Sequence, residues 1–305
     1  MDNLPSNDFK SGFVAVMGRP NVGKSTLMNG FLGQKIAAVS PRPQTTRRRQ
    51  LGIITTPSVQ VIFMDTPGVH QPHHKLGEAM NQQAREALED ADLVLWVVDT
   101  NQLPTSEDLL LAELVKSAQR ETVTFLVQNK IDLVPAHEMA QRQSAYQALL
   151  PDAQQVFISA TRGDGCQELL KLIIERLPLG PLYYPTEQVT DLYEREIAAD
   201  LIREAALVHL REEVPHGLAV RVDEYKDRNT DTAYIAATLL LERETHKPIV
   251  IGKKGAMLKK IGISARQEIE KLVGRKGFLD LRVKVRKNWQ NDEKTLKSLG
   301  FNSNG

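Results

Sequence analysis

Residues 18–25, GRPNVGKS, have the residue types and the spacing of a loop that holds nucleotide phosphates. The loop lies between an apolar run and a helical pattern, so backbone N–H groups and a helix N-terminus would face the phosphate oxygens. We expect Lys24 to reach the β- and γ-phosphates and Ser25 to bind Mg²⁺. The residues expected to contact the nucleotide here are Gly18, Arg19, Pro20, Asn21, Val22, Gly23, Lys24, Ser25 and Thr26.

A second short motif, DTPG, follows an apolar run some 40 residues after this loop. Asp65 is expected to hold Mg²⁺ through water. The Gly68 N–H is expected to bond the γ-phosphate, because a residue without a side chain permits that approach. The predicted nucleotide contacts in this motif are Asp65, Thr66, Pro67 and Gly68.

Two further motifs predict a guanine base. In NKID, the Asp132 carboxylate would accept hydrogen bonds from guanine N1–H and the exocyclic amine, whereas adenine presents an acceptor at N1. Lys130 is expected to lay its stem along the base, and the Ala160 N–H of the SAT motif to meet guanine O6. The residues predicted around the base are Asn129, Lys130, Asp132, Ser159, Ala160 and Thr161.

A second glycine loop, GKKG, lacks the spacing and the GK[ST] ending of the first. Such a loop opening a helix is typical of KH domains, in which it clamps the backbone of single-stranded RNA. Residues 246–290 carry 13 Lys and Arg against 3 Asp and Glu, a net charge of +10, although the whole chain has a net charge of only +1. The predicted RNA-binding residues are Gly252, Lys253, Lys254, Gly255, Lys259 and Lys260, with an apolar groove walled by Ile249, Ile251, Ile261 and Ile263.

The elements that must position the first set of motifs alternate between strands and helices. Apolar runs rich in Val, Ile and Phe predict buried strands, and helical patterns separate them. The predicted strands lie within 13–18, 59–66, 92–99, 122–129 and 154–160, and the predicted helices at 24–32, 76–90, 106–119, 137–150 and 166–177. We therefore expect an α/β fold, in which helices cover both faces of a mostly parallel sheet.

The second half has a different order, and a stretch with three prolines near residues 178–188 predicts the boundary. We expect domains at 1–180 and 191–305, joined by a linker at 181–190, the second being an α+β KH domain of type II order. Its predicted elements are a helix at 192–211, strands at 217–225 and 232–244 joined by a turn at 226–231, a helix after GKKG, another at 264–273, and a strand at 278–286. The tail after Asp292 is expected to be frayed, and Trp289 either stacks on a base or packs the last strand.

Across residues 1–180 the motifs resemble the translation-factor-related class of P-loop GTPases. The resemblance implies that Thr46, or alternatively Thr45, contacts Mg²⁺ and the γ-phosphate, so that Ser25, Thr46 and Asp65 form the metal set. It implies Lys24, Thr46 and Gly68 as the catalytic group. Val69 stands where Ras-like relatives have a glutamine, so slow intrinsic hydrolysis is expected. Asn21 resembles the asparagine that holds K⁺ in some such GTPases.

Nearly the whole chain resembles the Era family of GTPases, in the order GRPNVGKST, QTTR, DTPG, NKID, SAT and IGKKG. The resemblance implies a GTP-hydrolysing switch that binds the 3′ end of small-subunit (16S) rRNA and assists assembly of the 30S subunit, with GTP or GDP and Mg²⁺ as cofactors. It also implies a monomer with peripheral association to the inner face of the cell membrane. One cysteine, Cys166, suits the cytoplasm. The alternative function is that of a GTP-dependent RNA-modifying enzyme.

Overall fold

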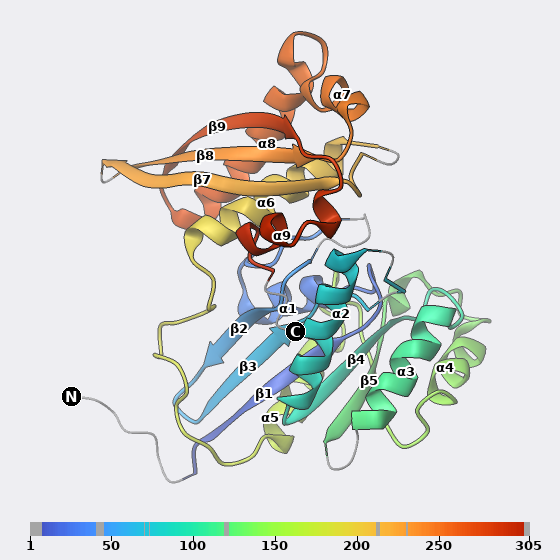
Figure 1. Ribbon diagram of the computed structural model, residues 1–305. Helices are drawn as coiled ribbons and strands as arrows, with labels where there is room; N and C mark the ends of the chain where they lie inside the picture. The colour runs from blue at the N-terminus through green and yellow to red at the C-terminus, as the bar shows by residue number, and fades with distance from the viewer. Residues whose placement is uncertain are drawn as a thin grey trace. The chain divides into compact units, whose positions relative to one another are not determined.

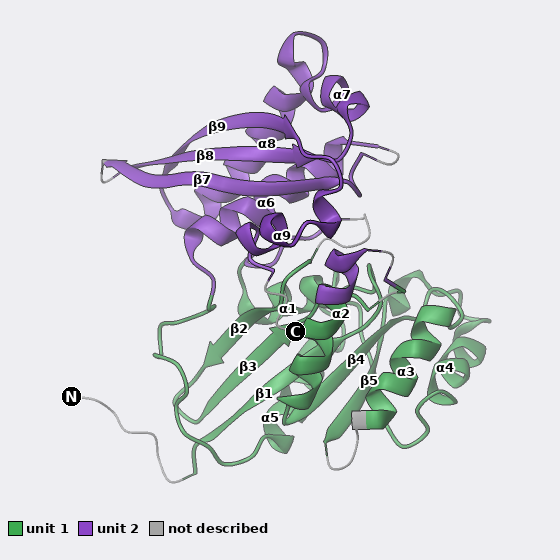
Figure 2. Cartoon of the chain, viewed as in Figure 1, with its two compact units in different colours: residues 1–34, 46–71, 80–191 green, residues 35–45, 72–79, 192–305 purple. Residues whose placement is uncertain are grey.

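The computed structural model describes residues 8–40, 46–69, 71–72, 74–118, 122–211, 214–229 and 231–301. The chain divides into two compact units (Figure 2). The first comprises residues 1–34, 46–71 and 80–191, and the second comprises residues 35–45, 72–79 and 192–305. The domain limits expected from the sequence stay a prediction.

A six-stranded sheet forms the centre of the first unit, with strand order β2-β3-β1-β4-β5-β6. The strands are β1 (Lys10–Met17), β2 (Gln50–Thr55), β3 (Val59–Asp65), β4 (Leu93–Asp99), β5 (Val123–Asn129) and β6 (Gln154–Phe157). All neighbouring strands are parallel except β2 and β3, which are antiparallel. The predicted α/β fold class is therefore confirmed, and β2 is a strand that the sequence analysis missed.

Helices cover both faces of this sheet, as neighbouring residues of β3 show (Figure 1). Ile62 and Met64 belong to a buried cluster that also contains residues of α2, α3 and α4. Phe63, between them, stacks on Phe31 of α1 with ring centroids 5.1 Å apart. Because successive strand residues point to opposite faces, α1 lies opposite the other three helices. The helices are α1 (Lys24–Leu32), α2 (Lys75–Glu89), α3 (Ser106–Ala118), α4 (Met139–Gln147) and α5 (Cys166–Arg176).

The segment expected to be a linker runs along the edge of the sheet. The Ile53 N–H donates to the Val189 carbonyl at 2.8 Å, and the Leu51 N–H donates to the Asp191 carboxylate at 2.8 Å. Both donors lie on β2, the edge strand. These contacts pair backbone groups that an open sheet edge would otherwise expose.

The second unit has a three-stranded sheet in the order β7-β8-β9. Strands β7 and β8 are antiparallel, whereas β8 and β9 are parallel. Its elements are α6 (Glu194–His209), β7 (Leu218–Asn229), β8 (Thr232–Leu241), α7 (Lys247–Ile251), α8 (Ala256–Val273), β9 (Lys276–Val285) and α9 (Glu293–Ser298). The expected order of helix, strand, strand, helix, helix, strand is confirmed, and α9 follows it.

Three local predictions in this unit were wrong. The turn expected at 226–231 is mostly strand, because β7 continues to Asn229 and its charged residues lie on a solvent-exposed edge. The helix expected at 264–273 is the second half of α8, and the other helix of the pair is α7, before GKKG. The described part of the tail after Asp292 begins with a helix and is not frayed there, since the Asp292 side chain caps α9 and Leu296 is buried.

Trp289 packs inside the second unit and does not offer a surface for a base. Its side chain is fully buried, and its Nε1–H donates to the Gly217 carbonyl at 3.0 Å. None of the helices in the described part of the chain has the length and the apolar character that a membrane span requires.

Candidate functional site

The phosphate loop connects β1 to α1 and is already folded around its lysine. The Lys24 ammonium donates to the carbonyls of Gly18 at 2.8 Å and Arg19 at 3.1 Å. Burial lowers the pKa of Lys24 to about 8, and the nearby Asp65 carboxylate opposes that shift. Phosphate oxygens would replace the carbonyls as partners and would favour the charged form of Lys24.

The three residues predicted to hold Mg²⁺ lie beside this lysine. The Ser25 hydroxyl donates to Asp65 Oδ2 at 2.8 Å and lies 2.8 Å from the Thr46 hydroxyl. Thr46 Oγ1 is 3.5 Å from the same carboxylate oxygen. The structure thus brings Ser25, Thr46 and Asp65 together, as predicted, while Thr45 lies outside the described residues.

The donor set fits Mg²⁺. Asp65 is fully buried, and its Oδ1 has no hydrogen-bond partner within the described part of the chain. Burial raises the pKa of Asp65, opposed by Lys24 and by the Ser25 hydroxyl. A cation near Oδ1, held directly or through water, would offset the cost of this buried charge. Two hydroxyls and one carboxylate would leave coordination positions open for phosphate oxygens and water, which are usual ligands of Mg²⁺.

The backbone of the DTPG motif packs closely against the phosphate loop. A Cβ at Gly68 would lie 2.6 Å from the backbone nitrogen of Pro20, so a side chain at this position would push the two loops apart. The Thr66 hydroxyl donates to the Val16 carbonyl at 2.8 Å and so anchors the end of β3 to β1. Val69 packs against the buried core cluster. Of this motif, Gly68 lies against Pro20 of the phosphate loop, and the Asp65 carboxylate lies with Ser25 and Thr46.

The base motifs are joined to the phosphate loop through Asn129. Its amide donates to the Val22 carbonyl at 2.7 Å, and its Oδ1 accepts the Ala160 N–H at 2.9 Å. The N–H expected to meet guanine O6 is therefore engaged with Asn129 in this structure. A Cβ at Gly23 would lie 2.3 Å from the Asn129 amide nitrogen, so Gly23 permits this contact. Asp132 Oδ1 is buried and has no partner within the described residues, which suits an acceptor for a base.

The sequence analysis missed Asp99, which ends β4 and joins the two nucleotide loops. Its Oδ2 lies 2.7 Å from the Lys130 ammonium and 3.8 Å from the Arg19 guanidinium. Lys130 also donates to the Asn21 carbonyl at 2.8 Å, and Arg19 donates to the buried Asp108 at 3.2 Å. Asp99 ends an apolar strand, as Asp65 and Asn129 do, and that position was the available signal. Arg19 and Lys130 are thus held by acidic side chains.

Substitution of Asp99 by Asn is expected to weaken GDP binding about 10-fold, because the two loops would be less preorganised. Losing charged partners should lower the free energy of unfolding by about 2 kcal/mol. Titration with GDP and urea unfolding would measure these effects. Glu113→Gln is the control, since it removes an exposed pair with Lys116 and should cost under about 0.5 kcal/mol. Unchanged GDP affinity in the Asp99 variant would limit this residue to a stabilising role.

The second glycine loop joins α7 to α8 in the second unit. Gly252 and Gly255 have φ values of 72° and 80°, and Lys254 has a φ of 51°, so three of its four residues adopt positive φ. Lys253, Lys254, Lys259 and Lys260 are all exposed to solvent. The loop therefore presents several cations at the N-terminus of α8, a favourable place for phosphates.

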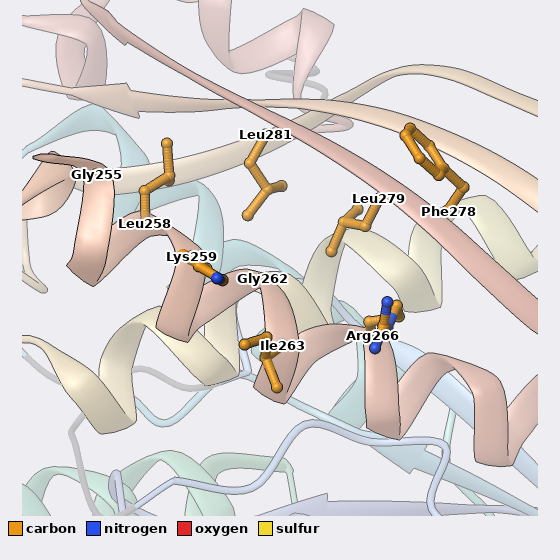
Figure 3. Close-up of a pocket in the computed structure, with 9 residues that line it drawn as sticks. All are labelled: Gly255, Leu258, Lys259, Gly262, Ile263, Arg266, Phe278, Leu279 and Leu281. Carbon is orange, nitrogen blue, oxygen red and sulfur yellow. The ribbon is translucent and has the colours of Figure 1, made fainter.

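An apolar groove lies between α8 and β9, but its walls differ from the prediction. The residues that line it are Gly255, Leu258, Lys259, Gly262, Ile263, Arg266, Phe278, Leu279 and Leu281 (Figure 3). Of the four predicted isoleucines only Ile263 is among them. Ile261 is buried in the core of the unit, because it lies on the opposite side of α8 from the groove. Ile249 and Ile251 belong to α7 and do not line the groove.

Comparisons with known proteins agree with this architecture. A family model described as a 50S ribosome-binding GTPase matches residues 13–130, and a KH domain model matches residues 213–290. The chain is 47% identical to the GTPase Era of Geobacter metallireducens over 98% of this chain and 100% of that protein. It is also 47% identical to the GTPase Era of Carboxydothermus hydrogenoformans, over 96% of this chain and 98% of that one.

Solved structures of Era match the full architecture. One is Era in complex with MgGDPNP and nucleotides 1506–1542 of 16S ribosomal RNA, with a TM-score of 0.90, 38% identity, and coverage of 96% of this chain and 99% of that one. An Aquifex aeolicus Era variant bound to GDP·AlF4⁻ matches with the same TM-score, identity and coverage. The motifs, the folds of the two units and the extent of these matches agree. The chain therefore belongs to the Era family of GTPases.

Proposed function

We propose that the chain is a GTP-hydrolysing switch that binds the 3′ end of small-subunit rRNA and assists assembly of the 30S subunit. One observation carries the GTP part of the proposal. Two carboxylate oxygens have no partner in the described chain: Asp65 Oδ1, at the last residue of β3, and Asp132 Oδ1, three residues after the end of β5 in the same sheet. The first suits a cation, and the second suits the N–H donors of guanine.

The chain's own groups then have distinct roles at the phosphates. The loop N–H groups and Lys24 bind the β- and γ-phosphates, while Ser25, Thr46 and Asp65 hold Mg²⁺. When bound, Mg²⁺ neutralises charge that develops on the phosphates. The Gly68 N–H orients the γ-phosphate from the DTPG side. Lys24, Thr46 and Gly68 are the residues that we assign to hydrolysis.

Hydrolysis by this arrangement is expected to be slow. Val69, which follows Gly68, has an aliphatic side chain that packs against the core. It offers no group to orient the attacking water, a task that glutamine performs in Ras-like GTPases. Slow turnover suits a switch whose hydrolysis times release from a partner.

The RNA part of the proposal rests on the second unit and on a relative. A KH-type GxxG loop clamps single-stranded RNA by its backbone, and the bases lie in the adjoining groove. Here that loop carries exposed lysines beside the groove between α8 and β9. The 38% identical Era structure was solved with nucleotides 1506–1542 of 16S rRNA. We infer that this chain binds the corresponding RNA through Gly252, Lys253, Lys254, Gly255, Lys259 and Lys260.

An RNA-modifying enzyme, the alternative, needs a second reactive centre. Cys166 is the one cysteine of the chain and begins α5. Burial raises the pKa of its thiol, with Asp164 acting in the same direction, so the nucleophilic thiolate is disfavoured. We therefore retain the switch. Binding of K⁺ at Asn21, a monomeric state, a cytoplasmic location and peripheral membrane association stay predictions.

The experiment that tests this function measures RNA binding by the whole chain in two nucleotide states. The probe is a fluorescent single-stranded fragment from the 3′ end of 16S rRNA, at one stated salt concentration. Tighter binding with a non-hydrolysable GTP analogue than with GDP is the expected result, since coupling requires a differential affinity between states. Absence of binding in both states would refute the RNA assignment. Equal binding in both would refute the switch.

A further inference from the structure

A cluster of one arginine and two aromatic rings lies near one end of the sheet in the second unit. Tyr234 on β8 and Phe278 on β9 are direct cross-strand neighbours. Their rings stack with centroids 5.8 Å apart and an interplanar angle of 18°. The Arg228 guanidinium lies over both, 4.9 Å from the Tyr234 centroid and 4.5 Å from the Phe278 centroid. We call Arg228, Tyr234 and Phe278 the arginine–aromatic cluster.

The cluster is exposed to solvent, and its guanidinium has no carboxylate partner among the described residues. Phe278 is 49% exposed, and Arg228 is exposed. Acidic neighbours on β7 are paired elsewhere: Glu224 with Lys226 at 2.6 Å, and Asp227 with Arg275 at 2.8 Å. Arg228 makes no ion pair with any residue that the structure describes. A guanidinium stacked on rings and without a carboxylate partner is well suited to a phosphate.

Phe278 connects this cluster to the groove between α8 and β9. Phe278 is among the residues that line the groove, at the end away from Gly255, but its ring projects to the opposite side of β9 from Leu279 and Leu281, as Figure 3 shows. From Gly255 to Arg266 the helix advances roughly 16 Å at 1.5 Å per residue. An RNA strand that is clamped at the GKKG loop and follows the groove therefore arrives at this end of β9. Because β9 is an edge strand, the RNA can pass around it to the Phe278 ring, where the arginine–aromatic cluster begins.

We propose that the arginine–aromatic cluster is a second, contiguous site for single-stranded RNA. A base that leaves the groove stacks on the exposed part of Phe278, and Arg228 binds the adjacent phosphate. Aromatic rings and arginine planes serve in this way in proteins that bind single strands, because every base has a face that can stack. The inference rests on the proposed RNA-binding function and extends it past the groove.

The test compares short and extended RNA probes on the full-length protein. The short probe is the smallest 3′-end fragment of 16S rRNA whose binding is lost in a Gly255→Asp variant. The extended probes carry one, two or four further nucleotides at either end. Affinity of the native protein should rise about 10-fold with extension at one end only, as expected for one stacked base. Arg228→Ala should remove that gain and leave the affinity for the short probe within about threefold. Phe278→Leu should also remove the gain from extension.

A matched control is Arg282→Ala. Arg282 is an exposed arginine on the same face of β9, four residues from Phe278, where it pairs with Asp280 at 3.0 Å. This variant should keep the full gain from extension. Arg228→Ala should also reduce the slope of log affinity against log salt by about 0.7 for the extended probe, the value for one phosphate contact on a single strand.

The other outcomes separate this inference from the function on which it rests. A native protein that binds the short probe and gains nothing from extension overturns the cluster's role and leaves the proposed function in place. A gain that persists in both variants places the extra contact elsewhere. An equal loss on short and extended probes, with thermal melting unchanged, means that the cluster shapes the groove and is not a separate site. Failure of the native protein to bind any 3′-end probe refutes the proposed function itself.

Discussion

Substitution of Asp132 by Asn is expected to weaken GTP binding about 100-fold and to make XTP the preferred nucleotide. The carboxylate would accept two hydrogen bonds from guanine, and its Oδ1 is buried without a partner in the described chain. Hydrogen bonds to a charged group contribute about 1.5–3 kcal/mol each, so losing both costs at least about 3 kcal/mol, or a factor of about 100. The Asn amide would instead donate a hydrogen bond to the xanthine O2.

Competition of GTP, XTP and ATP against a fluorescent GDP analogue measures the change. Asp152→Asn is the control, because Asp152 is an exposed aspartate in the turn before β6 and should leave all three affinities unchanged. The preference against ATP should weaken together with that for GTP, since the same carboxylate repels the acceptor at adenine N1. GTP binding as tight as in the native chain would show that Asp132 does not read the base.

The parts of the candidate site that could be predicted from sequence are local. Gly23 and Gly68 follow apolar strands and Asp65 ends one, at spacings that few other functions require. Parallel strands bring their carboxyl ends to one edge of the sheet. The structure adds the reason for the glycines, since a Cβ at Gly23 or Gly68 would lie under 3 Å from a neighbouring loop. The structure places Thr46 2.8 Å from Ser25, whereas Thr45 lies outside the described residues, so the preference for Thr46 stays a prediction.

The parts that could not be predicted depend on tertiary contacts. Asp99 is an ordinary strand-end residue until β4 lies beside β1 and β5, which brings Arg19 and Lys130 to the same carboxylate. The turn expected after Tyr225 rests on polarity alone, and an edge strand tolerates polar residues as well as a turn does.

The prediction of the residues that line the groove was mostly wrong. It chose isoleucines near GKKG in the sequence and did not ask which residues share one face of the helix. Leu258, Gly262 and Arg266 line the groove at i, i+4 and i+8 of α8. Ile261, one residue earlier than Gly262, is instead buried. Residues four apart share one face of a helix, and which face meets the groove is set by how α8 packs on α6 and β9. The sequence pattern alone does not say which stripe is covered.

Substitution of Gly255 by Asp is expected to weaken RNA binding about 100-fold and to leave GDP and GTP affinity unchanged. A carboxylate in the GKKG loop would face the RNA backbone, and like charges placed together cost several kcal/mol. Gly255 suits this test because a Cβ there meets nothing within 4 Å. Gly252 does not, since its Cβ would lie 2.7 Å from Met257 Cβ and would displace the start of α8.

The matched variant is Gly255→Asn, which separates charge from backbone strain. Gly255 has a φ of 80°, and Asn is among the non-glycine residues that most readily accept a left-handed conformation. The Asn variant should bind the 3′-end fragment within about threefold of the native chain, measured by fluorescence anisotropy at fixed salt. Equal loss in both variants would mean that the loop needs its backbone shape and that phosphate repulsion is not the cause. Loss of GTP binding in the Asp variant would contradict the division of nucleotide and RNA between the two units.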